Sequence, residues 1–184
     1  HEDGLIATCH HVLRDILQGG AKSRVGKHLE PITMESPVGK RFQITTLDRS
    51  QRIEAICLAS DPDHDVSLLQ FDGALPQGVQ IPRLIDIKST PMGSYTFTVT
   101  AFGKIEEAAY QYEYFSTGGE IWGLISRSSK AQSSPSVQML RLQTKTILPG
   151  MSGAPVYVQE LDGVVGLISG RFNVDDNGKW LGEI

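Results

Sequence analysis

Short runs of alternating or continuous apolar residues recur along the chain, each bounded by Gly, Pro, Asp or Ser. In the clearest run, Tyr95–Thr100, aromatic or apolar side chains alternate strictly with threonines, which is typical of a strand. Many short strands separated by turns predict an antiparallel sandwich or barrel. The expected strands are Leu5–Cys9, Arg41–Leu47, Arg52–Leu58, Val66–Phe71, Tyr95–Phe102, Ile121–Ser126, Val137–Gln143, Ala154–Val158 and Val164–Ser169.

Two segments are candidates for helix. His10–Leu17 is short and directly follows an expected strand. Ile105–Tyr114 is ambiguous, because its Glu and Ala residues favour helix while its three tyrosines favour strand. Ser128–Ser136, with five serines and a proline, predicts an exposed loop.

A cluster of Ser, Thr, Pro and Gly at Lys88–Ser94 marks the expected internal boundary. It divides the chain into two similar β-rich halves, residues 1–88 and 89–184. A length of 184 residues suits one compact domain or two small halves that share a surface.

Composition narrows the class of protein. Hydrophobic residues make up 40% and charged residues 21%, enough for a core without disulfides or a metal. A net charge of −4 argues against nucleic acid as the main partner, and no stretch of about 18 apolar residues predicts a membrane span. Only two cysteines, Cys9 and Cys57, favour free thiols in a reducing, cytoplasmic compartment, although their spacing alone leaves a disulfide open.

The stretch Leu148–Val156 carries the strongest chemical signal. Ser152 has a glycine next to it and another, Gly150, two residues before it. Acyl transfer needs a serine hydroxyl at a tight turn and backbone N–H groups aimed at the developing oxyanion. Those of Gly150 and Ser152 are the natural donors. The competing interpretation is a hairpin turn, which uses the same residue types.

A nucleophilic serine needs a base and a group that orients the base. Ile6–Leu13 is an apolar run that meets two histidines, His10 and His11, and composition alone does not choose between them. Asp61–Leu69 offers Asp65, an acid that opens an apolar strand and can accept an imidazole N–H; Asp-rich turns before strands are also common without function.

His64 lies among three aspartates, which raises the alternative of a metal site. That cluster has no second histidine or cysteine nearby in the sequence, so no metal and no cofactor are expected.

Together these segments resemble the trypsin-like (chymotrypsin-fold) serine peptidases, in a bacterial form. Thr8-Cys9-His10-His11-Val12 resembles their Thr-Ala-Ala-His-Val, and Asp65-Val66-Ser67-Leu68-Leu69 resembles their Asp-Ile-Ala-Leu-Leu. Gly150-Met151-Ser152-Gly153-Ala154-Pro155 resembles their Gly-Asp-Ser-Gly-Gly-Pro, and the order His, Asp, Ser agrees.

The resemblance implies an all-β fold of two antiparallel six-stranded β-barrels with the triad at their junction, the first barrel lacking its N-terminal strand. It implies a serine endopeptidase that works through an acyl-enzyme, with His11 as base, Asp65 as the orienting acid and Ser152 as nucleophile. The expected partner is a peptide or protein substrate. The alternatives are a catalytically silent peptide-binding module of the same fold and a purely structural β-domain.

The sequence departs from digestive trypsins at several positions. Met151 replaces the aspartate that receives the new N-terminus after activation, so that switch is not expected. The resemblance implies that Thr146 takes the place of the acid at the base of the primary pocket, which argues against Lys or Arg specificity. Ser169 and Gly170 are expected to line the peptide cleft. Arg171, next along that wall, either pairs with an acidic substrate side chain or points to solvent.

The start of the chain also departs from the resembled pattern. His1-Glu2-Asp3-Gly4 lacks the features of a signal peptide, and Asp3–Ile6 already resembles the middle of the first hairpin of the family. We therefore expect a portion of a longer protein, with fused or associated regulatory domains.

Overall fold

The structure, a computed structural model, describes residues 4–18, 35–46, 50–74, 80–87, 95–106, 111–127, 137–144, 147–148, 150–170, 172–174 and 180–183. It is mostly β, with two main antiparallel sheets and a two-stranded one, in two compact units, His1–Ile81 and Pro82–Ile184. The boundary expected at Lys88–Ser94 lies outside the described residues, so the division into 1–88 and 89–184 stays a prediction. None of the helices in the described ranges is long and apolar enough to cross a membrane.

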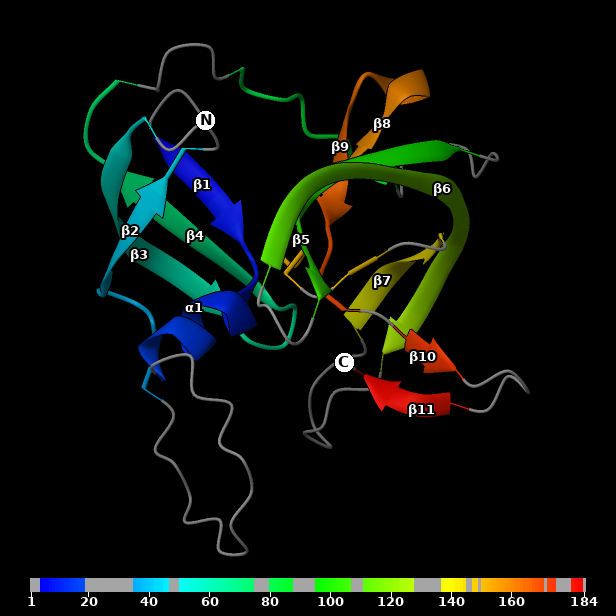
Figure 1. Cartoon of the computed structure of the whole chain (residues 1–184), viewed down its shortest axis with the longest axis horizontal. Helices are drawn as coiled ribbons and strands as arrows, with labels where there is room; N and C mark the ends of the chain where they lie inside the picture. Colours follow the sequence, from blue (N-terminus) through cyan, green and yellow to red (C-terminus); the bar gives the residue numbers. More distant parts are fainter. Residues whose placement is uncertain are drawn as a thin grey trace, which may run out of the picture. The chain divides into compact units, whose positions relative to one another are not determined.

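The described residues of the first unit form a four-stranded antiparallel sheet and the helix α1 (His10–Leu17) (Figure 1). Its strands lie in the order β1-β4-β3-β2. Burial alternates along β3, because its successive side chains point to opposite faces. The strands are β1 (Leu5–Thr8), β2 (Arg41–Thr45), β3 (Arg52–Asp61) and β4 (Val66–Phe71).

The buried face of this sheet forms the first core. Leu13 of α1 belongs to the same buried cluster as side chains from β2, β3 and β4, namely Phe42, Ala55, Cys57, Leu69 and Phe71. A register shift between Cys57 and Ala59 bends β3 just before it pairs with the start of β4. The core therefore packs α1 against the sheet through Leu13.

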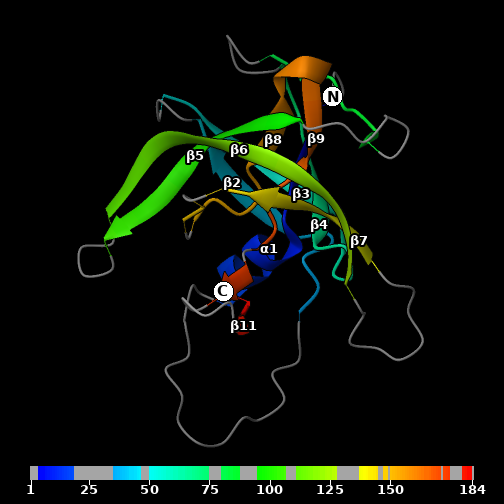
Figure 2. The ribbon, with the colours of Figure 1, turned by 90° about the vertical axis from the view of Figure 1, so that its right-hand side faces the viewer.

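The second unit is a five-stranded antiparallel sheet in the order β7-β6-β5-β8-β9. Two long strands, β5 (Thr96–Glu106) and β6 (Gln111–Arg127), curve together as a half-barrel (Figure 2). Gly119 permits the close packing inside this curve, since a Cβ there would lie 1.9 Å from the carbonyl oxygen of Gln143. The remaining strands of the sheet are β7 (Val137–Gln143), β8 (Pro155–Val158) and β9 (Gly163–Leu167).

Among the described residues, three smaller elements also belong to the second unit. A 3-10 helix, η2 (Gln159–Leu161), joins β8 to β9, and β10 (Phe172–Val174) pairs antiparallel with β11 (Trp180–Glu183). Arg83 and Ile85 hydrogen-bond to Val164 of β9, through Arg83 O to the Val164 N–H at 2.8 Å and through the Ile85 N–H to Val164 O at 2.9 Å. The segment that opens this unit is thereby fastened to the edge of its sheet.

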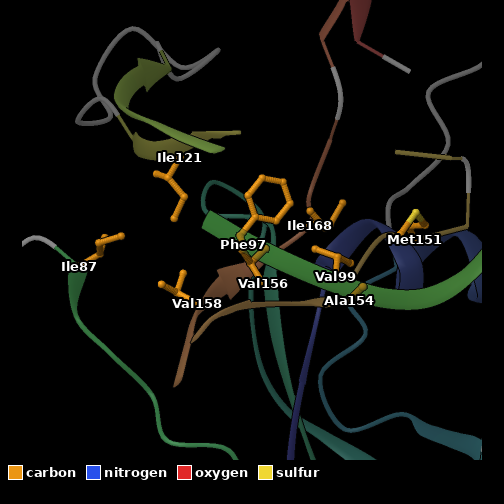
Figure 3. Close-up of a cluster of buried hydrophobic side chains, with 9 residues drawn as sticks. All are labelled: Ile87, Phe97, Val99, Ile121, Met151, Ala154, Val156, Val158 and Ile168. Atoms are coloured by element: carbon orange, nitrogen blue, oxygen red, sulfur yellow. The ribbon is translucent and has the colours of Figure 1, made fainter. Parts of the chain in front are cut away.

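The core of the second unit lies on the inner face of the curved sheet (Figure 3). Its buried side chains come from β5, β6 and β8, from the loops that flank β8 and β9, and, for Ile87, from the segment that precedes β5. Met151, from the loop before β8, is fully buried in this cluster. The cluster comprises Ile87, Phe97, Val99, Ile121, Met151, Ala154, Val156, Val158 and Ile168.

Each of the nine expected strands corresponds to an observed strand, and α1 occupies the first of the two helix candidates. The ambiguous segment Ile105–Tyr114 belongs to the facing ends of β5 and β6 on either side of residues 107–110, which lie outside the described ranges. The expected loop Ser128–Ser136 also lies outside them. Sequence analysis did not predict β10 or β11.

Candidate active site

Asp65 and His11 lie in direct contact in the first unit. His11 Nδ1 is 2.7 Å from Asp65 Oδ2, and the backbone N–H of His11 donates to Asp65 Oδ1 at 3.0 Å. The carbonyl oxygen of Asp65 also accepts the N–H of His10 at 3.3 Å. Asp65 has a backbone φ of +52°, in the left-handed region that Asp and Asn adopt more readily than most residues. The turn between β3 and β4 thus presents one residue to both the ring and the backbone of His11.

These contacts give Asp65 two tasks. The first N–H groups of a helix have no partner within the helix, and the N-cap residue of α1, Cys9, makes no side-chain capping bond. Asp65 supplies the missing acceptors from a different element and brings a negative charge to the helix N-terminus, where the helix dipole favours it. The same carboxylate accepts a hydrogen bond from Nδ1–H of the neutral ring, which leaves on Nε2 the lone pair that a base requires.

His10 is engaged elsewhere. Its Nδ1 lies 2.7 Å from Ser60 Oγ, which lies 2.6 Å from Oγ of the buried Ser67. Ser60 and Ser67 are paired in the register of β3 and β4. The row of hydrogen-bonded side chains therefore crosses this strand pair just before the turn that carries Asp65. Two adjacent histidines therefore have different partners, and His11 is the one that contacts a carboxylate.

In the aspartate-rich turn, Asp61 and Asp65 differ in their partners and in their exposure. Asp61 accepts the N–H groups of Asp63 and His64, each at 3.0 Å, and pairs with His64 Nδ1 at 2.7 Å. The backbone N–H of His64 lowers the pKa of Asp61, with smaller contributions from the His64 ring and the Asp63 N–H. Asp61 and His64 are both largely exposed, whereas the side chain of Asp65 is 15% exposed and that of His11 27%.

Ser152 lies in the second unit, on a loop with two left-handed glycines. Gly150 has a φ of +94° and Gly153 of +85°, which side chains with a Cβ rarely adopt. The N–H of Gly153 donates to Ile168 O at 2.7 Å, and the N–H of Ile168 returns a bond to Ala154 O at 2.8 Å. The buried Met151 side chain holds the middle of the loop in the core (Figure 3).

Backbone donors in this loop divide into two groups. Met151 donates its N–H to Leu148 O at 3.2 Å, and Ala154 donates to Met151 O at 3.0 Å. The N–H groups of Gly150 and Ser152, in contrast, donate to no residue that the structure describes. Two N–H groups two residues apart beside a half-buried hydroxyl match the donor set that a tetrahedral oxyanion requires.

The expected pocket residues are only partly described. Ser169 and Gly170 directly follow the buried Ile168, with Ser169 half-buried and Gly170 exposed. Thr146 and Arg171 lie outside the described residues, so their expected places in the primary pocket stay predictions.

Sequence analysis did not give Cys9, Ser60 or Ser67 any part in the site. Donor atoms of Cys9, His11 and Asp65 lie within 4.8 Å of one another. The sequence carried one signal for Cys9, its position two residues before His11 at the end of a strand. Its closeness to Asp65 depends on pairing across 56 residues of chain.

Comparison with known proteins identifies the family. A family model described as a trypsin-like peptidase domain matches residues 1–167. No curated protein sequence matches significantly. Solved structures with the same fold include an HtrA-type protease, AlgW, with a decapeptide. That match has a TM-score of 0.58 and 17% sequence identity, and it covers all of this chain and 44% of the AlgW chain.

Two further structures agree with this fold. Deg5 matches with a TM-score of 0.53 and 16% identity over 92% of this chain and 70% of its own. AlgW with a tripeptide matches with a TM-score of 0.55 and 16% identity over all of this chain and 48% of its own. The chain thus spans less than half of the AlgW chain, and its fold is chymotrypsin-like. The match of the trypsin-like peptidase model to residues 1–167, nearly the whole chain, shows that this protein belongs to the trypsin-like peptidase domain family.

Proposed function

We propose that this chain is a serine endopeptidase that cleaves peptide bonds through an acyl-enzyme, with His11, Asp65 and Ser152 as its triad. The observation that carries the proposal is the double contact of Asp65 with the ring and the backbone of His11. Asp61 makes a similar double contact with His64, but that pair is local in sequence and largely exposed. The Asp65–His11 pair joins residues that are far apart in sequence, and its side chains are more buried. The family membership supports the same reaction class.

In the proposed mechanism Nε2 of His11 accepts the proton of the Ser152 hydroxyl as Oγ attacks the carbonyl carbon of the substrate. The N–H groups of Gly150 and Ser152 stabilise the oxyanion that forms. The imidazolium, held by Asp65, then gives its proton to the leaving amine, and the acyl group remains on Ser152. A water molecule, deprotonated by His11, hydrolyses the acyl-enzyme and restores the serine.

The finer properties of the enzyme follow from the family resemblance. We propose that the four-stranded and five-stranded sheets are parts of two six-stranded barrels, the first lacking its N-terminal strand, and that Ser169 and Gly170 bind the substrate backbone. Thr146 gives the primary pocket a neutral base, and Arg171 at its wall favours an acidic substrate side chain. We further propose a cytoplasmic protein in which fused or associated domains control access to the site.

Covalent labelling with a fluorophosphonate probe tests the proposal, because only an activated serine reacts with it at an appreciable rate. We expect labelling of the wild-type chain, none of Ser152→Ala and almost none of His11→Ala. His10→Ala is the matched control, since His10 contacts Ser60 and no carboxylate, and it should label at close to the wild-type rate.

The labelling result also separates the alternatives. If the folded wild-type chain does not label but still binds peptides, it is a silent peptide-binding module and the proposal is wrong. If His10→Ala abolishes labelling and His11→Ala does not, the assignment of the base is wrong.

A further inference from the structure

Three side chains in the first unit lie close enough together to suggest that they bind a metal ion, and two of them also belong to the proposed triad. Within the described part of the chain, Cys9, His11 and Asp65 form the group of three metal-ligating side chains whose donor atoms all lie within 4.8 Å of one another. Cys9 is fully buried, while His11 and Asp65 are partly exposed. A thiol, an imidazole and a carboxylate together are a ligand set that zinc takes in proteins.

We propose that Cys9, His11 and Asp65 form an inhibitory binding site for Zn²⁺, with water as the fourth ligand. All three residues belong to one unit, and each sits at a rigid position. Cys9 is the N-cap of α1, His11 follows it in the first turn, and Asp65 is held in the β3–β4 turn by its bonds to the backbone of both His10 and His11. Donors on such supports need only short movements to close around an ion.

The distances show how much movement is needed. Zinc binds sulfur at about 2.3 Å and nitrogen or oxygen at about 2.0 to 2.2 Å, which separates neighbouring ligand atoms of a tetrahedron by roughly 3.3 to 3.7 Å. His11 Nδ1 and Asp65 Oδ2 are closer than this, at 2.7 Å, because a proton joins them. The ion would replace that proton, widen the pair by somewhat under 1 Å and draw the Cys9 sulfur inward. It enters from the side of His11 and Asp65, since Cys9 is fully buried.

Zinc binding would change the protonation of Cys9 and His11, and this change explains why it would inhibit the proposed reaction. The Cys9 thiol loses its proton to solvent, so one proton is released for each ion bound. The His11 proton moves from Nδ1 to Nε2, because Nδ1 now binds the metal and the ring stays neutral. Nε2 then has no lone pair to accept the proton of Ser152. The inhibitory consequence rests on the proposed function, whereas the metal site itself does not.

Cobalt spectroscopy tests the site without using activity. Co²⁺ is titrated into the Ser152→Ala chain, which retains all three ligands and cannot cleave itself. We expect a thiolate-to-cobalt charge-transfer band that saturates at one equivalent, disappears when Zn²⁺ is added, and is absent from Cys9→Ser in the same background. The serine variant should bind Zn²⁺ at least about 100-fold more weakly, since it loses a direct ligand.

Cys57→Ala is the matched control, because Cys57 is equally buried in the same unit but belongs to the hydrophobic cluster, so the band should persist. Should Cys9→Ser fail to fold, His11→Gln keeps the thiol and removes the imidazole, and it should also bind Zn²⁺ much more weakly. A chain without the band, or a band lost in Cys57→Ala and kept in Cys9→Ser, overturns the proposal.

Labelling by the fluorophosphonate probe then tests inhibition. Zn²⁺ should slow labelling of the wild-type chain at least tenfold, and a chelator should restore it. Cys9→Ser should label at similar rates with and without Zn²⁺. If the cobalt band forms but the metal-free enzyme does not label, the proposed peptidase function is wrong and the metal site is still supported. If labelling is normal and Zn²⁺ does not slow it, the inhibitory role is wrong.

Discussion

The two units hold their parts of the proposed site by different physical means. In the first unit side-chain hydrogen bonds do the positioning, because Asp65 reaches across from the β3–β4 turn to the ring and backbone of His11. In the second unit the loop around Ser152 is held by its left-handed glycines and backbone hydrogen bonds, and by the buried side chain of Met151. The proposed base therefore depends on the chemistry of one carboxylate, and the proposed nucleophile depends on the shape of its loop.

This difference predicts which substitutions separate chemistry from stability. Ser152 contributes a hydroxyl to a loop that other residues hold, so its removal should affect the reaction alone. Asp65 both orients the base and caps α1, so its removal should affect reaction and stability together. Four predictions test this contrast.

Ser152→Ala should have the largest effect on turnover. We expect kcat/KM to fall at least about 10⁴-fold, because the triad acts as a unit, while the free energy of unfolding changes by less than about 0.5 kcal/mol. Peptide hydrolysis and urea denaturation measure the two quantities. Activity above a tenth of wild type would remove Ser152 from the mechanism, and a large loss of stability would show that the hydroxyl helps to hold the loop.

Asp65→Asn should reduce kcat by about 10³-fold or more with little loss of stability. An asparagine tolerates the φ of +52°, and its carbonyl oxygen can still accept the His11 N–H. Its NH₂ group would face Nδ1 and force the ring proton onto Nε2, which disables the base.

Two controls sharpen this prediction. Asp65→Ala should lose the same activity and also about 1 to 2 kcal/mol of stability, because the helix loses its cap. Asp61→Asn should leave kcat within a factor of about two, since Asp61 pairs with the exposed His64. Equal losses in Asp65→Asn and Asp61→Asn would contradict the assignment of Asp65.

Met151→Ala should destabilise the second unit by about 2 to 5 kcal/mol, because it opens a cavity under the nucleophile loop. Met151→Leu nearly conserves the volume and should cost less than about 1.5 kcal/mol. Thermal unfolding of both variants, in the Ser152→Ala background to prevent self-cleavage, measures the difference. Similar midpoints for the two variants would mean that burial of Met151 does not anchor the loop.

Most of the fold could be predicted from local pattern, and the failures have physical causes. The expected run Ile121–Ser126 is only part of β6, because Gly118 and Gly119 signal a turn in the sequence yet permit close packing in a curved strand. The short β10 and β11 carry no alternation long enough to be recognised. Strand periodicity, in contrast, depends only on neighbours in the chain and was correctly interpreted.

The site could be predicted in outline and not in its contacts. Glycines around Ser152 and an acid before β4 are local signals. The choice of His11 over His10 required the family resemblance, because both residues follow the same strand. Three contacts depend on the pairing of β1 and β3 with β4, which no local pattern encodes. They are the capping of α1 by Asp65, the hydrogen bond of His10 with Ser60, and the closeness of Cys9 to His11 and Asp65.

The smallest expected effect is the dependence of kcat/KM on pH. The rate should rise from acid towards neutral pH and then level off, because the base must be a neutral imidazole to accept the serine proton. On the acid side it should fall about tenfold per pH unit.

Asp61 does not account for this rise. Its pKa is lowered in the folded chain, so its contribution to stability is complete above the ordinary aspartate value of about 3.9 and is lost only as the pH falls through the lower folded value. That window lies below the one in which the rate changes. His64→Gln is the control, because it removes the exposed imidazole beside Asp61 and should leave the profile unchanged. A profile that is flat from pH 5.5 to 8, or one that shifts with His64→Gln and not with Asp65→Asn, would contradict a histidine base held by Asp65.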